Sequence, residues 1–563
     1  MSNARRLLAF ALAGALLVQA CGVAAGAAVV GSGAPAGADA TAGADADAAD
    51  AERTAGRANA TTPRVLAVYP NPVAADDAGE FVAVRGGDVP NLTLSDGEDV
   101  FAVPRRRGVV VLSSDPNATR AVTPHPVVRA DLSLSNAGER LVLRRNGTVV
   151  HTVAYEDAPE SDRWNVSADR WTPLGLDLRP PVATGPADAT AFVLPDTPDA
   201  VGETLRSAED RLLLAGYTLS SDRVTDALVA AHRRGVRVRV LVEGGPVGGV
   251  SRRQAAALDR LNRAGVPVAV VDGPDATFAY HHAKYAVVDD RSLVLTENWK
   301  PAGTGGRDSR GWGVRVASAR TADELAAVFE ADSTGRGVVS WASYRRHGTF
   351  VADPPPNGTY PTRIEPAPVR ATAVRVLTAP GNAGEVTIRR LDGADERISV
   401  VNPRIDPDGR FFAALVRAAR RGVSVRLLLS NAWYDAEENE RVVARVRDLR
   451  ASGLPIEARI ADPSGRFGKV HAKGAVVDGE TVFVGSLNWN DHAATENREV
   501  VLELRGAEPA AYYRRAFERD WAAAGGGGGG RGDDGTPWLL VAGALASATL
   551  AGLVLKKTVR FER

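Results

Sequence analysis

The segment His282-Ala-Lys-Tyr-Ala-Val-Val-Asp289 occurs twice in this chain of 563 residues, the second time as His471-Ala-Lys-Gly-Ala-Val-Val-Asp478. The chain has eight histidines and six lysines, so random placement would give only about 0.1 His-X-Lys pairs. The apolar residues that follow each lysine predict a strand. Side chains two positions apart on a strand point to the same face, so each histidine shares a face with its lysine.

The duplication extends well beyond these segments. Residues 227–241 match residues 414–428, at an offset of 187 (414 minus 227), and both copies read as a helix ended by a glycine and followed by a β-rich run. Helices that alternate with strands are typical of α/β layers, and two copies indicate a pseudo-twofold pair. We expect repeat 1 at residues 183–345, a linker at 346–372 and repeat 2 at 373–523.

Two His-Lys pairs on facing repeats suit phosphoryl transfer. One imidazole can attack phosphorus while the other protonates the leaving oxygen, and the two ammonium groups can hold the nonbridging oxygens. We therefore expect both pairs to meet in one site between the repeats. This chemistry needs no metal and no other cofactor. The single cysteine, Cys21, excludes a disulfide framework and a cysteine-ligated zinc centre.

The region before the repeats has a different pattern. Between residues 63 and 178, short runs of alternating hydrophobicity such as Val65–Tyr69 and Gly108–Leu112 are separated by turn residues, including Asn146-Gly147. This pattern predicts an antiparallel β-sandwich.

The two ends of the chain suggest export and anchoring. Lys plus Arg and Asp plus Glu are both 68, so no global field points to nucleic acid or to an acidic substrate. Residues 1–31 contain two arginines and then an apolar run, as in a signal segment, and 32–62 read as a disordered linker. After a Gly-rich linker at 524–536, residues 537–555 predict a transmembrane helix and 556–563 a basic cytoplasmic tail. We expect a single C-terminal anchor in the cell membrane, with the catalytic part extracellular.

The duplicated segments resemble the His-X-Lys-X4-Asp motif of the phospholipase D superfamily, and the second copy continues as Gly485-Ser-Leu-Asn488 and then Glu499. The resemblance implies that the Ser and Asn side chains bind phosphate and that the later glutamate orients the histidine. It implies His282 as the nucleophile and His471 as the general acid. The implied catalytic residues are His282, His471, Lys284, Lys473, Asp289, Asp478 and Glu499, with Asn298, Ser486 and Asn488 as substrate-binding residues.

The first copy departs from this motif. Asn298 matches Asn488, but in Leu295-Thr-Glu-Asn298 the Gly-Ser pair is replaced and one residue is missing. Asp308-Ser-Arg-Gly311 stands where the second copy has Glu496-Asn-Arg-Glu499. The orienting carboxylate is therefore absent at its usual place, and nearby Asp308 is a candidate replacement. The departures leave the division of labour between the two histidines open.

The first region also carries a resemblance, through Tyr69-Pro-Asn-Pro72, Gly79-Glu-Phe-Val82 and Leu134–Leu143, to the lamin-tail domain, an immunoglobulin-like sandwich. Together the two resemblances imply a cell-surface phosphodiesterase that acts on phospholipid headgroups through a phosphohistidine. An exported nuclease and a catalytically weakened surface binding protein are the alternatives, and the sandwich has no identified partner. Three tryptophans of the repeats either pack in the core or touch lipid: Trp299, Trp433 and Trp489.

Overall fold

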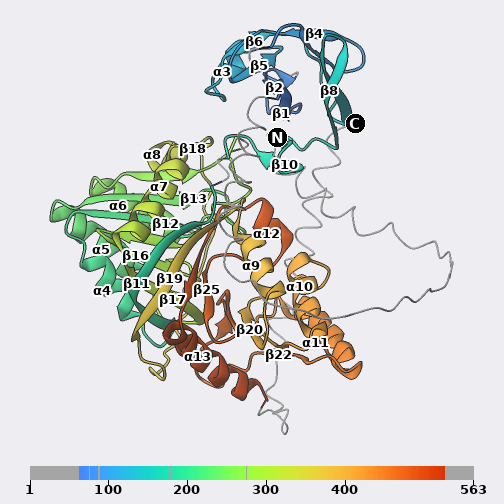
Figure 1. The fold of residues 1–563 in the computed structure, drawn as a ribbon. Helices are drawn as coiled ribbons and strands as arrows, with labels where there is room; N and C mark the ends of the chain where they lie inside the picture. Colours follow the sequence, from blue (N-terminus) through green and yellow to red (C-terminus); the bar gives the residue numbers. More distant parts are fainter. Residues whose placement is uncertain (1–61, 75–76, 87–88, 177–178, 274, 526–563) are drawn as a thin grey trace, which may run out of the picture. The chain divides into compact units, whose positions relative to one another are not determined.

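A computed structural model describes residues 62–525 except for 75–76, 87–88, 177–178 and 274 (Figure 1). The segments predicted at 1–31, 32–61, 526–536, 537–555 and 556–563 lie outside the described residues. The described residues form three sheets: a six-stranded and a four-stranded sheet in residues 64–173, and a 16-stranded sheet with strands from both repeats.

The region before the repeats consists of two sheets. Their strand orders are β10-β9-β1-β2-β5-β6 and β4-β3-β7-β8, and the alternating apolar residues of both, such as Val82 and Leu143, share one buried core. Asn146 and Gly147 both have positive φ, 48° and 81°, and form the tight turn between β7 and β8. Its relation to the lamin-tail domain stays a prediction. The elements are β1 (Arg64–Tyr69), β2 (Phe81–Arg85), β3 (Leu92–Ser95), β4 (Val100–Val103), β5 (Val109–Ser113), α3 (Pro116–Arg120), β6 (Val127–Arg129), β7 (Gly138–Arg145), β8 (Thr148–Glu156), β9 (Asp162–Asn165) and β10 (Arg170–Pro173).

Repeat 1 forms one half of the 16-stranded sheet. In α5 the buried residues Val224, Ala227, Leu228 and Ala231 recur at helical spacing and face the sheet, and Gly235 follows the helix with φ +93°. The elements are β11 (Val182–Leu194), α4 (Asp199–Arg206), β12 (Arg211–Gly216), α5 (Asp222–Arg233), β13 (Arg237–Glu243), α6 (Arg252–Arg263), β14 (Val268–Val271), β15 (Tyr285–Val288), β16 (Arg291–Leu295), β17 (Ser309–Ala317), α7 (Ala319–Ser333), β18 (Val338–Ser340) and α8 (Trp341–Tyr344).

Repeat 2 forms the other half with the same main order of elements, but β23 and α12 occur in repeat 2 alone and β18 and α8 in repeat 1 alone among the described residues. Here Gly422, with φ +97°, follows the helix that corresponds to α5. The elements are β19 (Ala367–Ala379), α9 (Ala383–Asp392), β20 (Arg397–Asn402), α10 (Arg410–Arg420), β21 (Ser424–Leu429), α11 (Ala436–Ala451), β22 (Ile456–Ile460), β23 (Lys469–Val470), β24 (Gly474–Val477), β25 (Thr481–Gly485), α12 (Asp491–Thr495), β26 (Glu499–Arg505) and α13 (Ala507–Gly525).

The strand order of the large sheet shows the pseudo-twofold relation directly. From β14 it runs β13-β12-β15-β16-β17-β11 and then β19-β26-β25-β24-β20-β21-β22, so the second half reverses the first. The long strands β11 and β19 pair antiparallel at the centre, and Figure 1 shows them between the helices of the two repeats. A core with residues of both repeats lies under α7 and α13. Separate cores lie under the helices of each repeat on the other face. The repeats therefore share one continuous frame.

The predicted fold class needs one correction. It included a C-terminal transmembrane helix, but within the described part of the chain no helix is long and apolar enough to cross a membrane. The last described helix, α13, ends at Gly525, and the predicted span at 537–555 lies outside the described residues. The transmembrane helix and the membrane localisation that depended on it are therefore withdrawn.

Candidate active site

Each histidine is held in place by the backbone of the other repeat. The His282 N–H donates to the carbonyl of Arg498 at 2.9 Å, and the His471 N–H donates to the carbonyl of Arg310 at 2.9 Å. The short strand β23, just before His471, pairs in parallel with β17 of repeat 1. This exchange brings the two predicted His-Lys pairs together at the boundary of the repeats.

The same two arginines form buried ion pairs that also cross between repeats. Arg310 Nε lies 2.9 Å from Asp520 Oδ2 on α13, and Arg498 Nη2 lies 2.9 Å from Asp332 Oδ1 on α7. The two arginines are 188 residues apart and so are the two aspartates, close to the offset of 187 between the matching helices. Each guanidinium also lies over a phenylalanine ring. These crossed pairs fix the two segments that carry the histidines.

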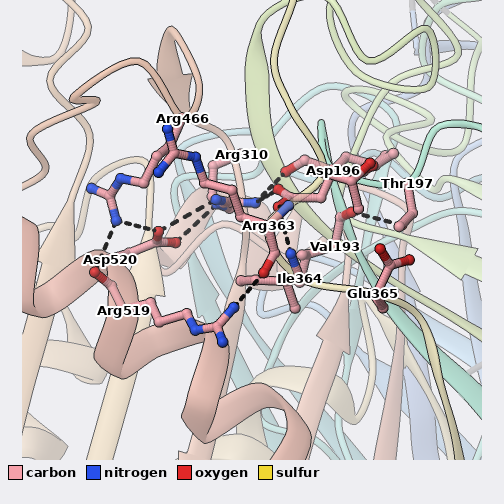
Figure 2. A network of polar contacts seen from close by, with 12 residues as sticks. Val193, Asp196, Thr197, Arg310, Arg363, Ile364, Glu365, Arg466, Arg519 and Asp520 are labelled. Atoms are coloured by element: carbon pink, nitrogen blue, oxygen red, sulfur yellow. Dashed lines mark hydrogen bonds and ion pairs between the residues drawn. The ribbon is translucent and has the colours of Figure 1, made fainter.

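The Arg310 side has an additional carboxylate. Figure 2 shows Asp196 pairing with Arg310, while Arg466 pairs with Asp520 from the opposite side. Asp196 Oδ1 also accepts the backbone N–H groups of Arg363 and Ile364, from the segment between the repeats. A charged network of this kind is stable only when every member is paired. It therefore ties the linker between the repeats into the frame.

The imidazole of His282 is oriented by a carboxylate of repeat 2. His282 Nδ1 lies 2.9 and 3.0 Å from the two carboxylate oxygens of Glu499, which is completely buried. Burial alone would raise the pKa of Glu499, but His282 and Lys284 outweigh it and hold that pKa below its ordinary value. Burial also lowers the pKa of His282 to about 4, despite the opposing effect of Glu499. An ionised Glu499 thus accepts the Nδ1 proton of a neutral imidazole and leaves a lone pair on Nε2.

His471 has a different carboxylate neighbour from the one predicted. Its Nδ1 lies 3.2 Å from Oε2 of Glu297, a buried residue of repeat 1. Asp308, the predicted replacement, instead pairs with Lys469 at 3.4 Å. That expectation was therefore wrong, because the side chain of Asp308 is directed to the lysine. Burial and the lysines Lys473 and Lys284 lower the pKa of His471 well below its ordinary value.

The two lysines occupy equivalent positions. Lys284 Nζ donates to the carbonyl of His282 at 2.6 Å, and Lys473 Nζ donates to the carbonyl of His471 at 2.8 Å. Both are buried, and burial lowers the pKa of each, that of Lys473 to about 8. An ammonium group has three donors, so each lysine keeps two N–H groups for a further acceptor.

The predicted aspartates do not reach this cluster. Asp289 and Asp478 follow β15 and β24, at the ends of these strands away from the histidines, and both have positive φ, 55° and 51°. Each carboxylate accepts three consecutive backbone N–H groups, the last of which belongs to the first residue of β12 or β20. Their contacts fix the turns at the far ends of the strands, so these carboxylates do not lie where they could contact a substrate at the histidines.

The predicted phosphate-binding residues lie next to the cluster, but they differ in whether their polar atoms are already hydrogen-bonded. Asn298 Oδ1 is buried with no hydrogen-bond partner among the described residues, which leaves it available to a ligand. Ser486 Oγ accepts the N–H of Val500 at 3.0 Å and interacts with Glu499. Asn488 is half-buried at the start of the segment after β25.

Two residues of the site were missed in the sequence. Tyr217 follows β12, and its ring meets the His282 ring edge-on at 4.8 Å between centroids. Glu297 was seen only as a departure from the motif. A glutamate next to a strand end, with a glycine at Gly311 across the β16–β17 hairpin, was the pattern that could have revealed it.

Comparisons with known proteins agree with this arrangement. Residues 201–333 and 387–521 match the family model described as "Cardiolipin synthase, PLD-like domain". Mitochondrial cardiolipin hydrolase of Xenopus tropicalis is 36% identical over 101 residues, 18% of this chain and 43% of the relative. Cardiolipin synthase A of Proteus mirabilis is 24% identical over 325 residues, 55% of this chain and 64% of the relative.

Among solved structures, phosphatidylserine synthase of Haemophilus influenzae has a TM-score of 0.46 and 12% identity, over 59% of this chain and 86% of that one. The chain spans less than two thirds of the length of the two curated relatives, 43% and 64%. The family model covers both repeats and both histidine segments. The duplicated part of the chain therefore belongs to the phospholipase D superfamily.

Proposed function

We propose that this chain is a phosphodiesterase that acts on phospholipids through a phosphohistidine on His282. The observation that carries the proposal is the exchange of partners between the repeats, in which each Nδ1 faces a carboxylate of the other repeat. Both Nε2 atoms are thereby assigned to one shared site. His282 is the nucleophile because Glu499 leaves its Nε2 unprotonated.

The reaction proceeds in two steps. In the first, His282 Nε2 forms a bond to phosphorus while the bond to the leaving oxygen breaks and His471 gives that oxygen a proton. In the second, water or an alcohol attacks the phosphohistidine, His471 takes its proton, and the P–N bond breaks. Lys284 and Lys473 neutralise the nonbridging oxygens throughout, so we expect turnover to persist in a chelator.

The rim of the site favours a phospholipid over a nucleic acid. The loops after β13 and β21 hold the exposed side chains of Val247 (79% exposed), Trp433 (85%) and Tyr434 (53%). Both loops lie beside the site, because the Val247 N–H donates to the Tyr217 hydroxyl and Lys469 lies over the Tyr434 ring. Exposed apolar patches mark interaction surfaces, and Trp and Tyr are favoured at membrane–water interfaces.

The charges at this rim point in the same direction. Lys469, Lys300 and Arg404 lie beside the site, and each is paired with a carboxylate at 3.4, 3.7 and 3.1 Å, respectively. A groove that follows a nucleic-acid backbone needs excess positive charge. Because each of these three cations is neutralised by a carboxylate, they provide no excess positive charge. Contact with a phospholipid surface requires only the apolar side chains.

The test compares phospholipid vesicles with labelled headgroups and single-stranded DNA, both in chelator. We expect headgroup release by the full chain, and loss of it in His282→Ala and His471→Ala. The matched control is His125→Ala, an exposed histidine of the sandwich, which should retain full activity. Cleavage of DNA alone would indicate a nuclease, and vesicle binding without any turnover would indicate a binding protein.

A further inference from the structure

We propose that Glu297 is the positioning residue of His471, a carboxylate supplied from the position next to β16 in place of the one that repeat 1 lacks near the start of β17. The proposal rests on the assignment of His471 as the general acid. Its first support is proximity, since Glu297 Oε2 is 3.2 Å from His471 Nδ1, and this buried nitrogen has no hydrogen-bond partner among the described residues. The equivalent contact in the other half of the site is made by Glu499, which the motif places at the start of β26.

Two glycines leave the space that the side chain of Glu297 occupies. A Cβ built on Gly311 would lie 2.2 Å from Glu297 Cγ, and a Cβ built on Gly303 would lie 2.5 Å from Oε2. Neither glycine has φ in the left-handed region, so the backbone does not require glycine at these positions. Gly311 is the residue that aligns with Glu499. The side chain of Glu297 thus fills the volume that a glutamate at position 311 would need.

The charges that face Glu297 come from both repeats. Lys473, Lys469 and Lys284 act on its carboxylate, and its Oε1 has no hydrogen-bond partner within the described chain. Burial raises the pKa of Glu297 to about 7 in spite of the three lysines. Glu499, by contrast, has a pKa below its ordinary value.

Because of this difference in pKa, the two histidines are protonated on different ring nitrogens. In the proposed arrangement a protonated Glu297 donates its O–H to His471 Nδ1, a buried nitrogen that has no hydrogen-bond partner among the described residues, and the ring proton then lies on Nε2. When Nε2 gives that proton to the leaving oxygen, the Glu297 proton moves to Nδ1, so the pair loses one proton in total. Ionised Glu499 instead accepts a proton from Nδ1 of His282 and leaves a lone pair on Nε2. The two carboxylates therefore separate a proton donor from a nucleophile.

Three variants of the full chain test the proposal by activity. Glu297→Gln should lower kcat about 100-fold with little change in KM, as removal of a group that orients another typically does. Asp308→Asn, a neighbouring carboxylate not in contact with His471, is the matched control and should change kcat less than about fivefold. Gly311→Glu alone should be as damaging as Glu297→Gln, because the new side chain collides with Glu297.

The combined variant Glu297→Ser with Gly311→Glu moves the carboxylate to the place that it has in repeat 2. We expect it to recover at least about tenfold of the kcat lost in Glu297→Ser alone, since positioning effects are coupled. A merely structural role of Glu297 would not produce such a recovery. Equal kcat in the double and the single variant overturns the proposal.

A spectroscopic measurement tests the contact without any substrate. In the full chain with ¹⁵N-labelled histidine rings, the His471 signals, assigned by their loss in His471→Gln, should report a proton on Nε2. In Glu297→Gln the shifts of both ring nitrogens should change, whereas unchanged shifts overturn the proposal. If the wild-type chain turns over no substrate, the proposed function fails, but this measurement still decides the position of Glu297. If the combined variant does not fold, the same measurement on Glu297→Gln still tests the position of Glu297.

Discussion

The two halves of the site share a frame and differ in one carboxylate. In both, an arginine beside the histidine segment pairs with an aspartate of the other repeat, and the lysine donates to the carbonyl of its own histidine. In one half Glu499 contacts His282 through two oxygens at 2.9 and 3.0 Å, and in the other Glu297 approaches His471 through one at 3.2 Å. The comparison teaches that backbone register sets where the histidines lie, while the carboxylates set which of them holds a proton.

The largest effect should be seen when the two histidine variants are compared on two substrates whose leaving groups differ. On phospholipids, both His282→Ala and His471→Ala should lose about 10⁴-fold or more in kcat. On a p-nitrophenyl phosphodiester, whose leaving group needs no proton, His471→Ala should recover at least about 100-fold relative to its loss on phospholipid. His282→Ala should recover nothing, because the nucleophile is still missing.

The measurement is the initial rate of each variant on each substrate, with His125→Ala as control. For each variant, the ratio of the rate loss on phospholipid to the rate loss on the p-nitrophenyl substrate assigns its role. Neither loss alone is sufficient. Recovery in His282→Ala and none in His471→Ala would reverse the assignment of nucleophile and acid.

The next effect is on stability and compares a crossed ion pair, Asp332 with Arg498, with the additional pair of Asp196 with Arg310. Asp332 pairs with Arg498 and also contacts His281 Nε2 at 3.2 Å, so Asp332→Asn should lower the free energy of unfolding by about 3–5 kcal/mol. Asp196→Asn should cost about half as much. Arg310 keeps Asp520, and asparagine Oδ1 can still accept the two backbone N–H groups. Urea denaturation followed by far-UV circular dichroism measures both, and an equal loss would show that Asp520 does not compensate for the missing charge of Asp196.

The pH dependence should separate the two carboxylate–histidine pairs. Since burial lowers the pKa of His282 to about 4, its Nε2 stays unprotonated down to that pH, and activity falls only below it. Burial raises the pKa of Glu297 to about 7, so the proton on its pair with His471 is lost above about pH 7. We expect kcat to fall between about pH 7 and pH 8 as this proton is lost, and this part of the fall should be absent in Glu297→Gln. Above about pH 8 both proteins should lose activity, because burial lowers the pKa of Lys473 to about 8.

Stability gives an independent check with a defined sign. The pKa of Glu297 in the folded chain lies above its unfolded value of 4.5, so stability that protonation provides is present below that value and is lost as the pH rises toward 7. Glu297→Gln should therefore gain stability relative to the wild type between about pH 4.5 and pH 7. A difference in free energy of unfolding that is constant over this range would contradict the raised pKa.

Sequence patterns were sufficient where the physical cause is local. Alternation and helical periodicity predicted the strands and helices of the repeats, and the two His-Lys pairs indicated one shared site. Partners that depend on the crossing between repeats were not predictable, because Glu499 is 217 residues from His282. Asp289 and Asp478 show the opposite error, since a constant spacing from the histidine was read as membership of the site. Each lies at the far end of its strand instead.

The smallest effect concerns the three tryptophans, which one sequence pattern could not distinguish. Trp299 and Trp489 are buried, the first donating to the Ala215 carbonyl and the second stacked on Phe411 at 5.4 Å, whereas Trp433 is exposed at the rim. Trp433→Ala should therefore reduce turnover on vesicles about three- to tenfold, because one interfacial aromatic contributes on the order of 1 kcal/mol. On a dispersed short-chain phospholipid the same variant should equal the wild type, since the catalytic cluster is untouched. The rim of repeat 1 offers the matched comparison, because Val247→Ala removes less apolar area and should have a weaker effect on vesicles. Equal losses of Trp433→Ala on vesicles and on dispersed substrate would place this side chain at the substrate itself and remove the argument for a lipid surface.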